Sequence, residues 1–369
     1  MPVLNKIVVQ NYRNIALQEM SFSPNINCIT GNNGEGKTSL LDAIYYLSMT
    51  KSALGAGSDK FNFRYGTDSF SIGGTFSMPS GIEARFAVHA SSDGAKTVRR
   101  DDKKYQKVSD HIGVLPVVMV SPADTALVSE SGDGRRRFVN AVLSQMDRSY
   151  LDTAQQYNRY LAQRNRLLKD PAHLDMDLLD AFDARLGALA EPVAAARARF
   201  VEALAPVVGE YYRQLSNGRE EVGIEYRTDL DKGPLESQLA AGRDKDRILK
   251  YTTVGLQRDD FIFTMNGYPI RKCGSQGQQK SFLVSLKFAQ YDLMKRAGGC
   301  APTLLLDDLF DKLDMGRVSS LLSMVAGSDF GQIFLSDSNK VRISGIVDTL
   351  TQDRSYFEAR GGEFFRVEE

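Results

Sequence analysis

The first third of the chain alternates apolar and polar positions, a pattern typical of β-strands. We interpret residues 3–30 as two strands, and the second, Asn25–Thr30, runs directly into a glycine-rich loop. A helix is expected to begin at Lys37. From Phe61 to Tyr105, short alternating segments are separated by Pro-Ser-Gly and Ser-Asp-Gly turns. Such turns between alternating segments predict an antiparallel sheet beside the loop.

The middle of the chain changes to a helical pattern. The apolar run Val114–Val120 predicts one more buried strand, and helical periodicity then extends from Gly134 through Lys169. Asp170-Pro171 interrupts it, because proline disfavours a helical conformation in the residue before it. A second helical stretch covers Met176–Leu215, so we expect a helical hairpin or a small bundle.

The last third returns to alternating strands and helices. The pattern predicts a strand at Val222–Arg227, a hairpin turning at Asn266-Gly267, a helix from Gln276 to Arg296, and strands at Thr303–Leu306 and Ile333–Leu335. Both ends of the chain therefore contribute to one α/β core, which encloses an antiparallel β subdomain and a helical insertion, or short arm. We place the boundaries of the three parts at 1–134, 135–218 and 219–369.

Composition narrows the class of protein. The 369 residues are 42% hydrophobic and 25% charged, which is ordinary for a globular protein. No apolar run approaches the roughly 20 residues that span a bilayer, and the N-terminus lacks the apolar region of a secretory signal. We therefore expect a cytoplasmic protein without membrane contact. Cys28, Cys273 and Cys300 have no metal-ligand or redox spacing and are interpreted as reduced thiols.

The glycine-rich loop carries the most specific motif. Gly31-Asn32-Asn33-Gly34-Glu35-Gly36-Lys37-Thr38 matches the pattern G-x-x-x-x-G-K-[ST] between a predicted strand and a predicted helix. Its backbone N–H groups and the positive end of the helix dipole would hold the phosphates of ATP, together with the following Ser39. Lys37 would reach the β- and γ-phosphates, and Thr38 would supply a hydroxyl to Mg²⁺. An ordinary glycine turn is the alternative.

A second acidic motif follows the predicted strand Thr303–Leu306. Asp307 and Asp308 stand at the carboxyl end of this strand, where open α/β sheets bind their ligands. The segment resembles a Walker B motif. Asp307 would then hold Mg²⁺, and Asp308 would orient or deprotonate the attacking water. Taken alone, two acids after a strand are more often a helix cap.

A third motif, Ser275-Gln276-Gly277-Gln278-Gln279-Lys280, precedes the predicted helix and lies about 30 residues before the acidic pair. It resembles the signature of ABC ATPases. The resemblance implies that Ser275, Gly277 and Gln278 contact the γ-phosphate bound by a second protomer, so that ATP joins a dimer. A simple helix cap is the alternative, but the order of motifs, ending in the D-loop-like Leu313-Asp314, favours the signature.

The whole chain resembles the RecF family of bacterial recombination-repair ATPases, within the ABC/SMC superfamily. The resemblance is carried by Val9-Gln10-Asn11-Tyr12-Arg13-Asn14, Ser121-Pro122 with Asp124, Arg135-Arg136-Arg137-Phe138, Arg258-Asp259-Asp260 and Gly274–Lys280. It implies a head-like ATPase that dimerises on ATP, binds single-stranded or gapped duplex DNA, helps load recombinase and acts in replication, repair and the SOS response. Mediator proteins of the RecO and RecR type are the implied partners.

Some positions depart from the family's usual residues. Leu256-Gln257 stands where the family has Pro-His, Asn140 where aspartate is common, and Lys280 where arginine is common. The sequence also differs from other relatives. No histidine follows the acidic motif, as one would in ABC transporter subunits, and the roughly 240 residues between Thr38 and the signature leave no room for the long coiled coil of SMC proteins.

DNA contact must come from a local patch, because Lys+Arg and Asp+Glu both total 46 and the net charge is zero. One candidate patch is the cluster of Lys96, Arg99, Arg100, Lys103, Lys104 and Lys107, although Asp101 and Asp102 interrupt it and a solvated hairpin is an alternative. The other candidate is the run Arg135–Arg137 at the start of a predicted helix. There cations oppose the helix dipole, so an anionic partner or a salt bridge is expected.

These observations favour an ATP-gated DNA clamp. ATP held by Lys37 and Thr38 would be capped by the second copy's Ser275 and Gly277, and hydrolysis near Asp308 would release the dimer. Asp308 is one methylene shorter than the glutamate usual in ABC ATPases, so we expect a weak ATPase that acts as a switch. The alternatives are an ATPase regulatory subunit that acts on a protein partner, such as a nuclease or defence effector, and a metabolic P-loop kinase.

Overall fold

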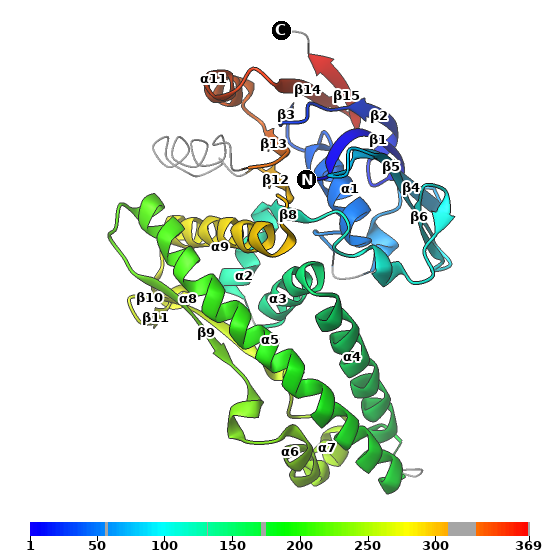
Figure 1. Cartoon of the computed structure of the whole chain (residues 1–369), viewed down its shortest axis with the longest axis vertical. Helices are drawn as coiled ribbons and strands as arrows, with labels where there is room; N and C mark the ends of the chain where they lie inside the picture. Colours follow the sequence, from blue (N-terminus) through cyan, green and yellow to red (C-terminus); the bar gives the residue numbers. More distant parts are fainter. Residues whose placement is uncertain (56–57, 131, 171–174, 309–329, 368–369) are drawn as a thin grey trace. The chain divides into compact units, whose positions relative to one another are not determined.

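The computed structural model describes residues 1–55, 58–130, 132–170, 175–308 and 330–367. These residues form two compact units (Figure 1). The first unit combines Met1–Thr125 with Val284–Glu369, and the second is Ala126–Leu283. The first unit is therefore built from both ends of the chain, as the sequence predicted. The division into three parts at residues 134 and 218 stays a prediction.

An antiparallel sheet of six strands forms one layer of the first unit. Its order is β2-β1-β4-β5-β6-β7. The strands are β1 (Val3–Tyr12), β2 (Ile15–Ser21), β4 (Ser69–Ser77), β5 (Glu83–Ser91), β6 (Lys96–Arg100) and β7 (Lys103–Lys104). This sheet confirms the predicted antiparallel subdomain. The prediction of two strands within residues 3–30 is wrong, because a tight turn with Arg13 at a φ of 54° splits the first of them into β1 and β2.

The second sheet of this unit is mostly parallel and holds the buried strands. Its order is β15-β14-β3-β13-β12-β8. The strands are β3 (Ile26–Thr30), β8 (Val117–Val120), β12 (Thr303–Asp307), β13 (Ile333–Asp337), β14 (Arg354–Arg360) and β15 (Glu363–Val367). The helices α1 (Lys37–Met49) and α11 (Lys340–Leu350) belong to the same unit. Because β3, β13 and β12 are parallel neighbours, their carboxyl ends meet at one edge of the sheet.

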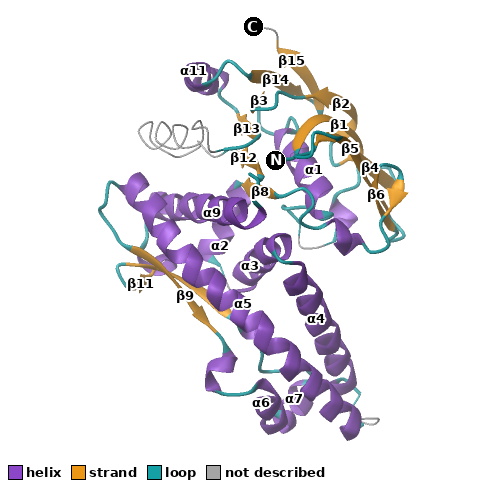
Figure 2. Ribbon diagram, viewed as in Figure 1, coloured by secondary structure: helices purple, strands orange, loops and turns teal. Residues whose placement is uncertain are grey.

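The second unit is mainly helical, as the purple ribbons of Figure 2 show. Its long helices are α3 (Gly132–Met146), α4 (Arg148–Leu168) and α5 (Met176–Ser216), and α4 packs along α5 as the predicted helical hairpin. A small sheet of order β11-β10-β9 consists of β9 (Val222–Arg227), β10 (Asp260–Met265) and β11 (Tyr268–Pro269). The shorter helices are α2 (Thr125–Ser129), α6 (Leu235–Ala241), α7 (Arg243–Leu249) and α8 (Ile270–Cys273). Helix α9 (Gln276–Gly298) begins in the second unit and ends in the first.

The remaining regular elements are short 3-10 helices at Asp59–Phe61, Val108–His111, Pro122–Asp124, Asp229–Lys232 and Leu256–Arg258. No helix within the described ranges is both long and apolar enough to cross a membrane.

A buried ionic cluster joins α4, α5 and α7 in the second unit. The Arg164 side chain is fully buried and donates to Asp183 at 2.6 Å and to Asp246 at 2.7 Å. It also donates to the hydroxyl of Thr252 at 2.9 Å. A buried cation is tolerated only when anions and hydrogen bonds compensate for its lost hydration. Arg164 therefore fixes the relative positions of the consecutive helices α4 and α5 and of α7, whose Asp246 lies 82 residues from Arg164 in sequence.

Candidate nucleotide-binding site

At two positions of the glycine-rich loop, Gly31 and Gly36, the backbone conformation and the close packing allow only glycine. Gly31 has a φ of 147°, and a Cβ there would lie 2.6 Å from the carbonyl oxygen of Ala359 on β14. Gly36 has a φ of 108°, and its Cβ would lie 2.8 Å from the side-chain nitrogen of Asn14. Both residues combine a left-handed conformation with close packing. The loop is thus shaped by neighbouring strands before α1 begins at Lys37.

The ammonium group of Lys37 lies over the mouth of this loop. Its Nζ donates to the carbonyl oxygens of Gly31 at 2.7 Å and of Asn32 at 3.1 Å, and the residue is only 4% exposed. Carbonyl oxygens are weaker partners for an ammonium than charged phosphate oxygens are. The side chain is therefore positioned to exchange these contacts for a bound polyphosphate.

The predicted acidic motif lies beside the loop, at the carboxyl edge of the parallel sheet. Asp307 ends β12 and is 1% exposed, and its Oδ1 accepts hydrogen bonds from Thr38 at 3.0 Å and from Ser336 at 2.6 Å. Burial raises the pKa of the Asp307 carboxyl, while these two hydrogen bonds oppose the rise. The backbone N–H of Asp308 donates to the same Ser336 hydroxyl at 3.1 Å. Ser336 thus positions both acids, a role that sequence reasoning missed.

The residues present fit a magnesium ion that is shared with a nucleotide. Thr38 and Asp307 offer one hydroxyl and one carboxylate, which are oxygen ligands of the kind Mg²⁺ prefers. Among the described residues there is no group of three or more His, Cys, Asp or Glu that could hold a metal ion. A cation at this position would therefore depend on phosphate oxygens for its remaining ligands, as is usual for Mg²⁺ bound with a nucleotide.

A pocket of 330 Å³ opens at this edge of the sheet. Its lining includes six residues of the predicted phosphate-binding segment and the predicted catalytic residue Asp308. The complete lining is Arg13, Asn14, Asn33, Gly34, Gly36, Lys37, Thr38, Ser39, Phe61 and Asp308. Sequence reasoning did not assign Arg13, Asn14 or Phe61 to the site, although the segment ending at Arg13-Asn14 carried part of the family resemblance.

Two segments far apart in sequence brace the predicted loop. Glu35 accepts a hydrogen bond from the backbone N–H of Gly361 on its carboxylate and one from Gly362 on its carbonyl oxygen. A Cβ at Gly362, whose φ is 88°, would lie 2.4 Å from the backbone oxygen of Asn14. The turn between β14 and β15 therefore packs against both the glycine-rich loop and the turn between β1 and β2.

Arg13 is held at the pocket by residues of the same unit. Its Nε lies 3.0 Å from Asp42, a fully buried residue of α1. The other end of its guanidinium donates to Ser52 at 3.0 Å and to Asn62 at 3.1 Å. These contacts fix the guanidinium of Arg13 at the rim of the pocket, with its charge paired to Asp42.

The signature-like segment lies in the second unit, at the N-terminus of α9. Ser275 is exposed, its N–H donates to the side chain of Gln278 at 2.7 Å, and its hydroxyl accepts from the Gln278 backbone at 3.3 Å. Gln278 also donates to Glu220 at 2.8 Å. The geometry is that of a helix cap, which leaves the Ser275 hydroxyl and the first turn around Gly277 accessible to a ligand. The contacts of Ser275, Gly277 and Gln278 with nucleotide stay predictions, and Leu313-Asp314 lies outside the described residues.

The three arginines at the start of α3 form ion pairs within the second unit. Arg135 donates to both carboxylate oxygens of Asp260, at 2.8 and 3.0 Å. Arg136 donates to the carbonyl oxygen of Asp259 at 2.8 Å, and Arg137 lies 3.3 Å from Asp133. The salt-bridge alternative therefore accounts for much of this run. An anionic partner is therefore expected to bind only through the arginine N–H donors that these pairs leave free.

The basic cluster on β6 and β7 divides into structural and exposed members. Lys96 lies 2.7 Å from Asp59 and donates to the Thr50 carbonyl, so it is part of the sheet's packing onto α1. Arg99, Lys103 and Lys104 are exposed. Because β7 is the edge strand, cations there also protect the sheet from pairing with other chains.

Two of the residues that depart from the family pattern have local partners. Gln257 accepts from the Tyr157 hydroxyl at 2.8 Å and donates to the Val254 carbonyl at 2.6 Å. Asn140 accepts from Tyr150 at 2.6 Å and from Arg197 at 2.9 Å. Both side chains are thus integrated into the packing of α3, α4 and α5.

Comparisons with known proteins agree with this geometry. A family model described as an AAA domain matches residues 6–185. The chain is 41% identical over 367 residues to the DNA replication and repair protein RecF of Parabacteroides distasonis, covering 100% of both chains. It is 37% identical over 357 residues to the protein of the same name from Flavobacterium johnsoniae, covering 96% of this chain and 99% of that protein.

The chain is also similar in fold to two solved structures. The recombination mediator protein RecF with ATP, from the RecFOR pathway, superposes with a TM-score of 0.89 at 26% identity and covers 100% of this chain and 98% of its own. The Smc head domain from Pyrococcus furiosus, with its extended coiled coil, superposes with a TM-score of 0.56 at 14% identity and covers 100% of this chain and 96% of its own. The second likeness concerns the fold alone.

Proposed function

Because this chain belongs to the RecF family of DNA replication and repair proteins, we propose that it is an ATP-operated switch that acts on DNA. The observation that carries the proposal is the contact between Thr38 of the glycine-rich loop and Asp307 of β12, 269 residues apart in sequence and 3.0 Å apart in the fold. Thr38, Asp307 and Lys37 together form a site for a nucleoside triphosphate. The alternative hypothesis of a metabolic P-loop kinase would leave the Ser275–Lys280 segment, whose first two residues are exposed, without a role.

In the proposed cycle, the residues of one chain hold ATP and a second copy completes the site. Lys37 and the loop N–H groups bind the phosphates, and Thr38 with Asp307 would hold Mg²⁺, which neutralises phosphate charge. Ser275 and Gly277 of the second copy cap the γ-phosphate, and Asp308 orients the attacking water. The dimer would close on single-stranded or gapped duplex DNA and open after hydrolysis.

Further parts of the proposal come from the relatives. A structural relative belongs to the RecFOR pathway, so partners of the RecO and RecR type are proposed for this chain. The proposed activity is a slow ATPase, because Asp308 carries a shorter side chain than glutamate and places its carboxylate further from the water. The cytoplasmic location stays a prediction.

Ser275→Ala tests completion of the site by a second copy. If the hydroxyl contacts a γ-phosphate across the dimer, removing it should raise the ATP concentration needed for dimerisation at least about tenfold, since a hydrogen bond to a charged group contributes about 1.5–3 kcal/mol. Light scattering across an ATP titration measures this. Nucleotide binding to the monomer should not change, and dimers that form as in the wild type would contradict the proposal.

Asp308→Asn tests the hydrolytic role. The amide keeps the shape of the side chain but cannot accept a proton, so turnover should fall about a hundredfold, as for the loss of a general base. ATP should still bind, and dimers formed with ATP should persist. Phosphate release and dimer lifetime measure the two effects. Turnover at the wild-type rate would exclude Asp308 as the group that activates water.

A further inference from the structure

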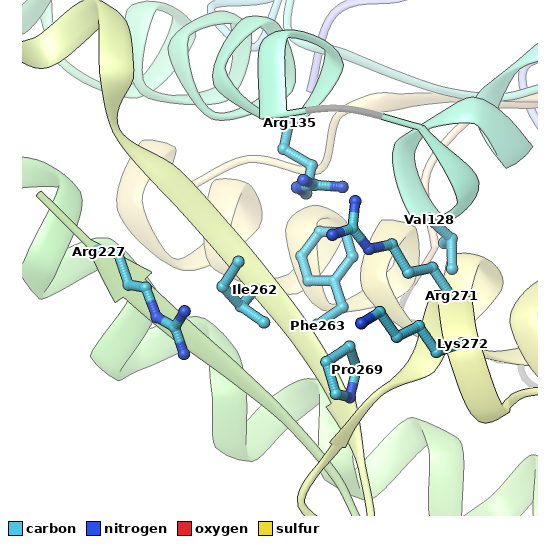
Figure 3. A pocket seen from close by; sticks show the side chains of 8 residues that line it. All are labelled: Val128, Arg135, Arg227, Ile262, Phe263, Pro269, Arg271 and Lys272. Atoms are coloured by element: carbon cyan, nitrogen blue, oxygen red, sulfur yellow. The ribbon is translucent and has the colours of Figure 1, made fainter.

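A second pocket, of 240 Å³, lies wholly within the second unit (Figure 3). Its four cations come from three elements: Arg135 from α3, Arg227 from β9, and Arg271 and Lys272 from α8. Its other lining residues are Val128, Ile262, Phe263 and Pro269, so no carboxylate lines it. In Figure 3 the guanidinium ends of Arg135 and Arg271 point toward each other above the ring of Phe263, and the ammonium end of Lys272 lies below this ring, near Pro269.

Two of the four cations have carboxylate partners outside the pocket lining. Arg135 is 4% exposed and donates to Asp260 twice and to the carbonyl oxygens of Leu127 and Glu130. These bonds use four of its five N–H groups, which leaves one donor on a guanidinium that lines the pocket. Arg227 donates to Glu225 on the same strand, at 2.8 and 3.0 Å.

The other two cations are uncompensated. Arg271 and Lys272 are exposed, and neither has an ion pair or side-chain hydrogen bond with any residue in the described part of the chain. They line the same pocket as Arg135, whose own charge is balanced by Asp260. Like charges that share a pocket without a counter-ion repel each other, and a bound anion removes that repulsion.

We propose that Arg135, Arg271 and Lys272 form a binding site for a phosphate of the DNA backbone. Two guanidinium groups and an ammonium match the tetrahedral oxygens of a phosphate. An acidic peptide is less favoured, because the apolar lining offers it little surface: Val128 is 2% exposed and Phe263 is 6% exposed. Tyr268, which precedes the pocket residue Pro269, is 69% exposed and offers a ring on which a base can stack.

The same site would connect DNA to the signature-like segment. Helix α8 carries both unpaired cations and is followed at once by Gly274 and Ser275. Gly274 donates to the Ile270 carbonyl at 2.8 Å, and a Cβ at Gly274 would lie 2.8 Å from that oxygen. Because Gly274 packs closely against Ile270, the connection between α8 and Ser275 is short and rigid. A phosphate bound by Arg271 and Lys272 would therefore also restrict the position of the start of α9. This step rests on the function proposed above, because it assigns the DNA contact to a particular place.

The test compares two double variants of equal charge change. R271Q/K272Q removes the unpaired cations of the pocket, and R166Q/K169Q removes two exposed cations of the α4 end of the same unit. Binding of a fluorescent gapped duplex is measured by anisotropy with a slowly hydrolysed ATP analogue, across a salt series. The pocket variant should lose at least about tenfold in affinity and reduce the salt slope by about 1, because one phosphate contact is lost. The control variant should bind like the wild type.

A second readout tests the connection to Ser275. In the wild type, the gapped duplex should lower the ATP concentration needed for dimerisation, and in R271Q/K272Q it should not, because coupling between two ligands is reciprocal. Without DNA, both proteins should need the same ATP concentration. Thermal unfolding of both variants at the wild-type temperature shows that the substitutions leave the fold intact.

The possible failures are distinguishable. A wild type that never binds DNA contradicts the proposed function itself. A wild type that binds DNA, together with a pocket variant that binds equally well, overturns only the phosphate site. The same holds if R99Q/K103Q on β6 and β7 loses DNA affinity while the pocket variant keeps it. Loss of partner-protein binding with unchanged DNA affinity would assign the pocket to an acidic peptide and overturn the proposal.

Discussion

Lys37→Ala is expected to lower the affinity for ATP by about 10²–10⁴-fold. In the free site Nζ donates to two loop carbonyls, at 2.7 and 3.1 Å. Bound phosphate would replace these with two charge-assisted hydrogen bonds, each contributing about 1.5–3 kcal/mol. Their combined loss, about 3–6 kcal/mol, corresponds to the stated range. ATP-dependent dimerisation and turnover should disappear with binding, because both depend on an occupied site.

Titration with a fluorescent ATP analogue measures the change. Lys60→Ala is the matched control, since Lys60 is an exposed lysine of the same unit outside the pocket lining. The control should bind ATP like the wild type. Because Lys37 also bonds to its own loop, the thermal unfolding of the variant without nucleotide should be measured as well. An ATP affinity within about threefold of the wild type would show that Lys37 does not contact phosphate.

Arg164→Ala is expected to destabilise the second unit by about 3–5 kcal/mol. The substitution leaves Asp183 and Asp246 buried without their cation, and an uncompensated buried charge costs about this much. Asp183 keeps a second contact with Arg243, and Asp246 keeps hydrogen bonds from Thr253, which limits the loss. Since the cluster joins α4, α5 and α7, the helices should separate before the sheets of the first unit unfold.

Limited proteolysis and denaturant unfolding, followed by circular dichroism at the helical wavelengths, measure this effect. Arg166→Ala on the same helix is the control, because Arg166 is exposed and should change the stability by less than about 0.5 kcal/mol. ATP binding by the first unit should survive in Arg164→Ala. Equal stability of the two variants would mean that the buried pairs contribute little beyond their desolvation cost.

Local patterns predicted most of the fold. The alternation that indicates strands and the glycine-rich loop are properties of adjacent residues, so β4, β5 and α1 could be placed from the sequence. The division of the first predicted strand was missed, because its turn at Arg13 contains neither glycine nor proline. The hairpin of β14 and β15 was also missed, although Gly361-Gly362 between two strands is a local hairpin signal, and only its pairing with β3, more than 300 residues earlier, lies beyond local patterns.

The residues of the candidate site could be predicted where a local sequence motif indicates their chemical role. Lys37, Thr38 and Asp307 were each assigned from local spacing, and the fold brings them together. Ser336 and Asn14 could not be found in this way, because each acts on residues that only tertiary structure brings near. The arginine run on α3 shows the converse difficulty: charge in a sequence does not reveal whether Asp260 is already paired with it.

The bracing of the glycine-rich loop has a consequence for synthesis of the protein. Gly31 packs against Ala359, and Glu35 is bonded to the turn at Gly361 and Gly362. A ribosome makes the loop early, yet its supports are added more than 300 residues later. A nascent chain should therefore carry the complete nucleotide motif without a formed site, and gain the ability to bind ATP only when the β14–β15 hairpin has emerged.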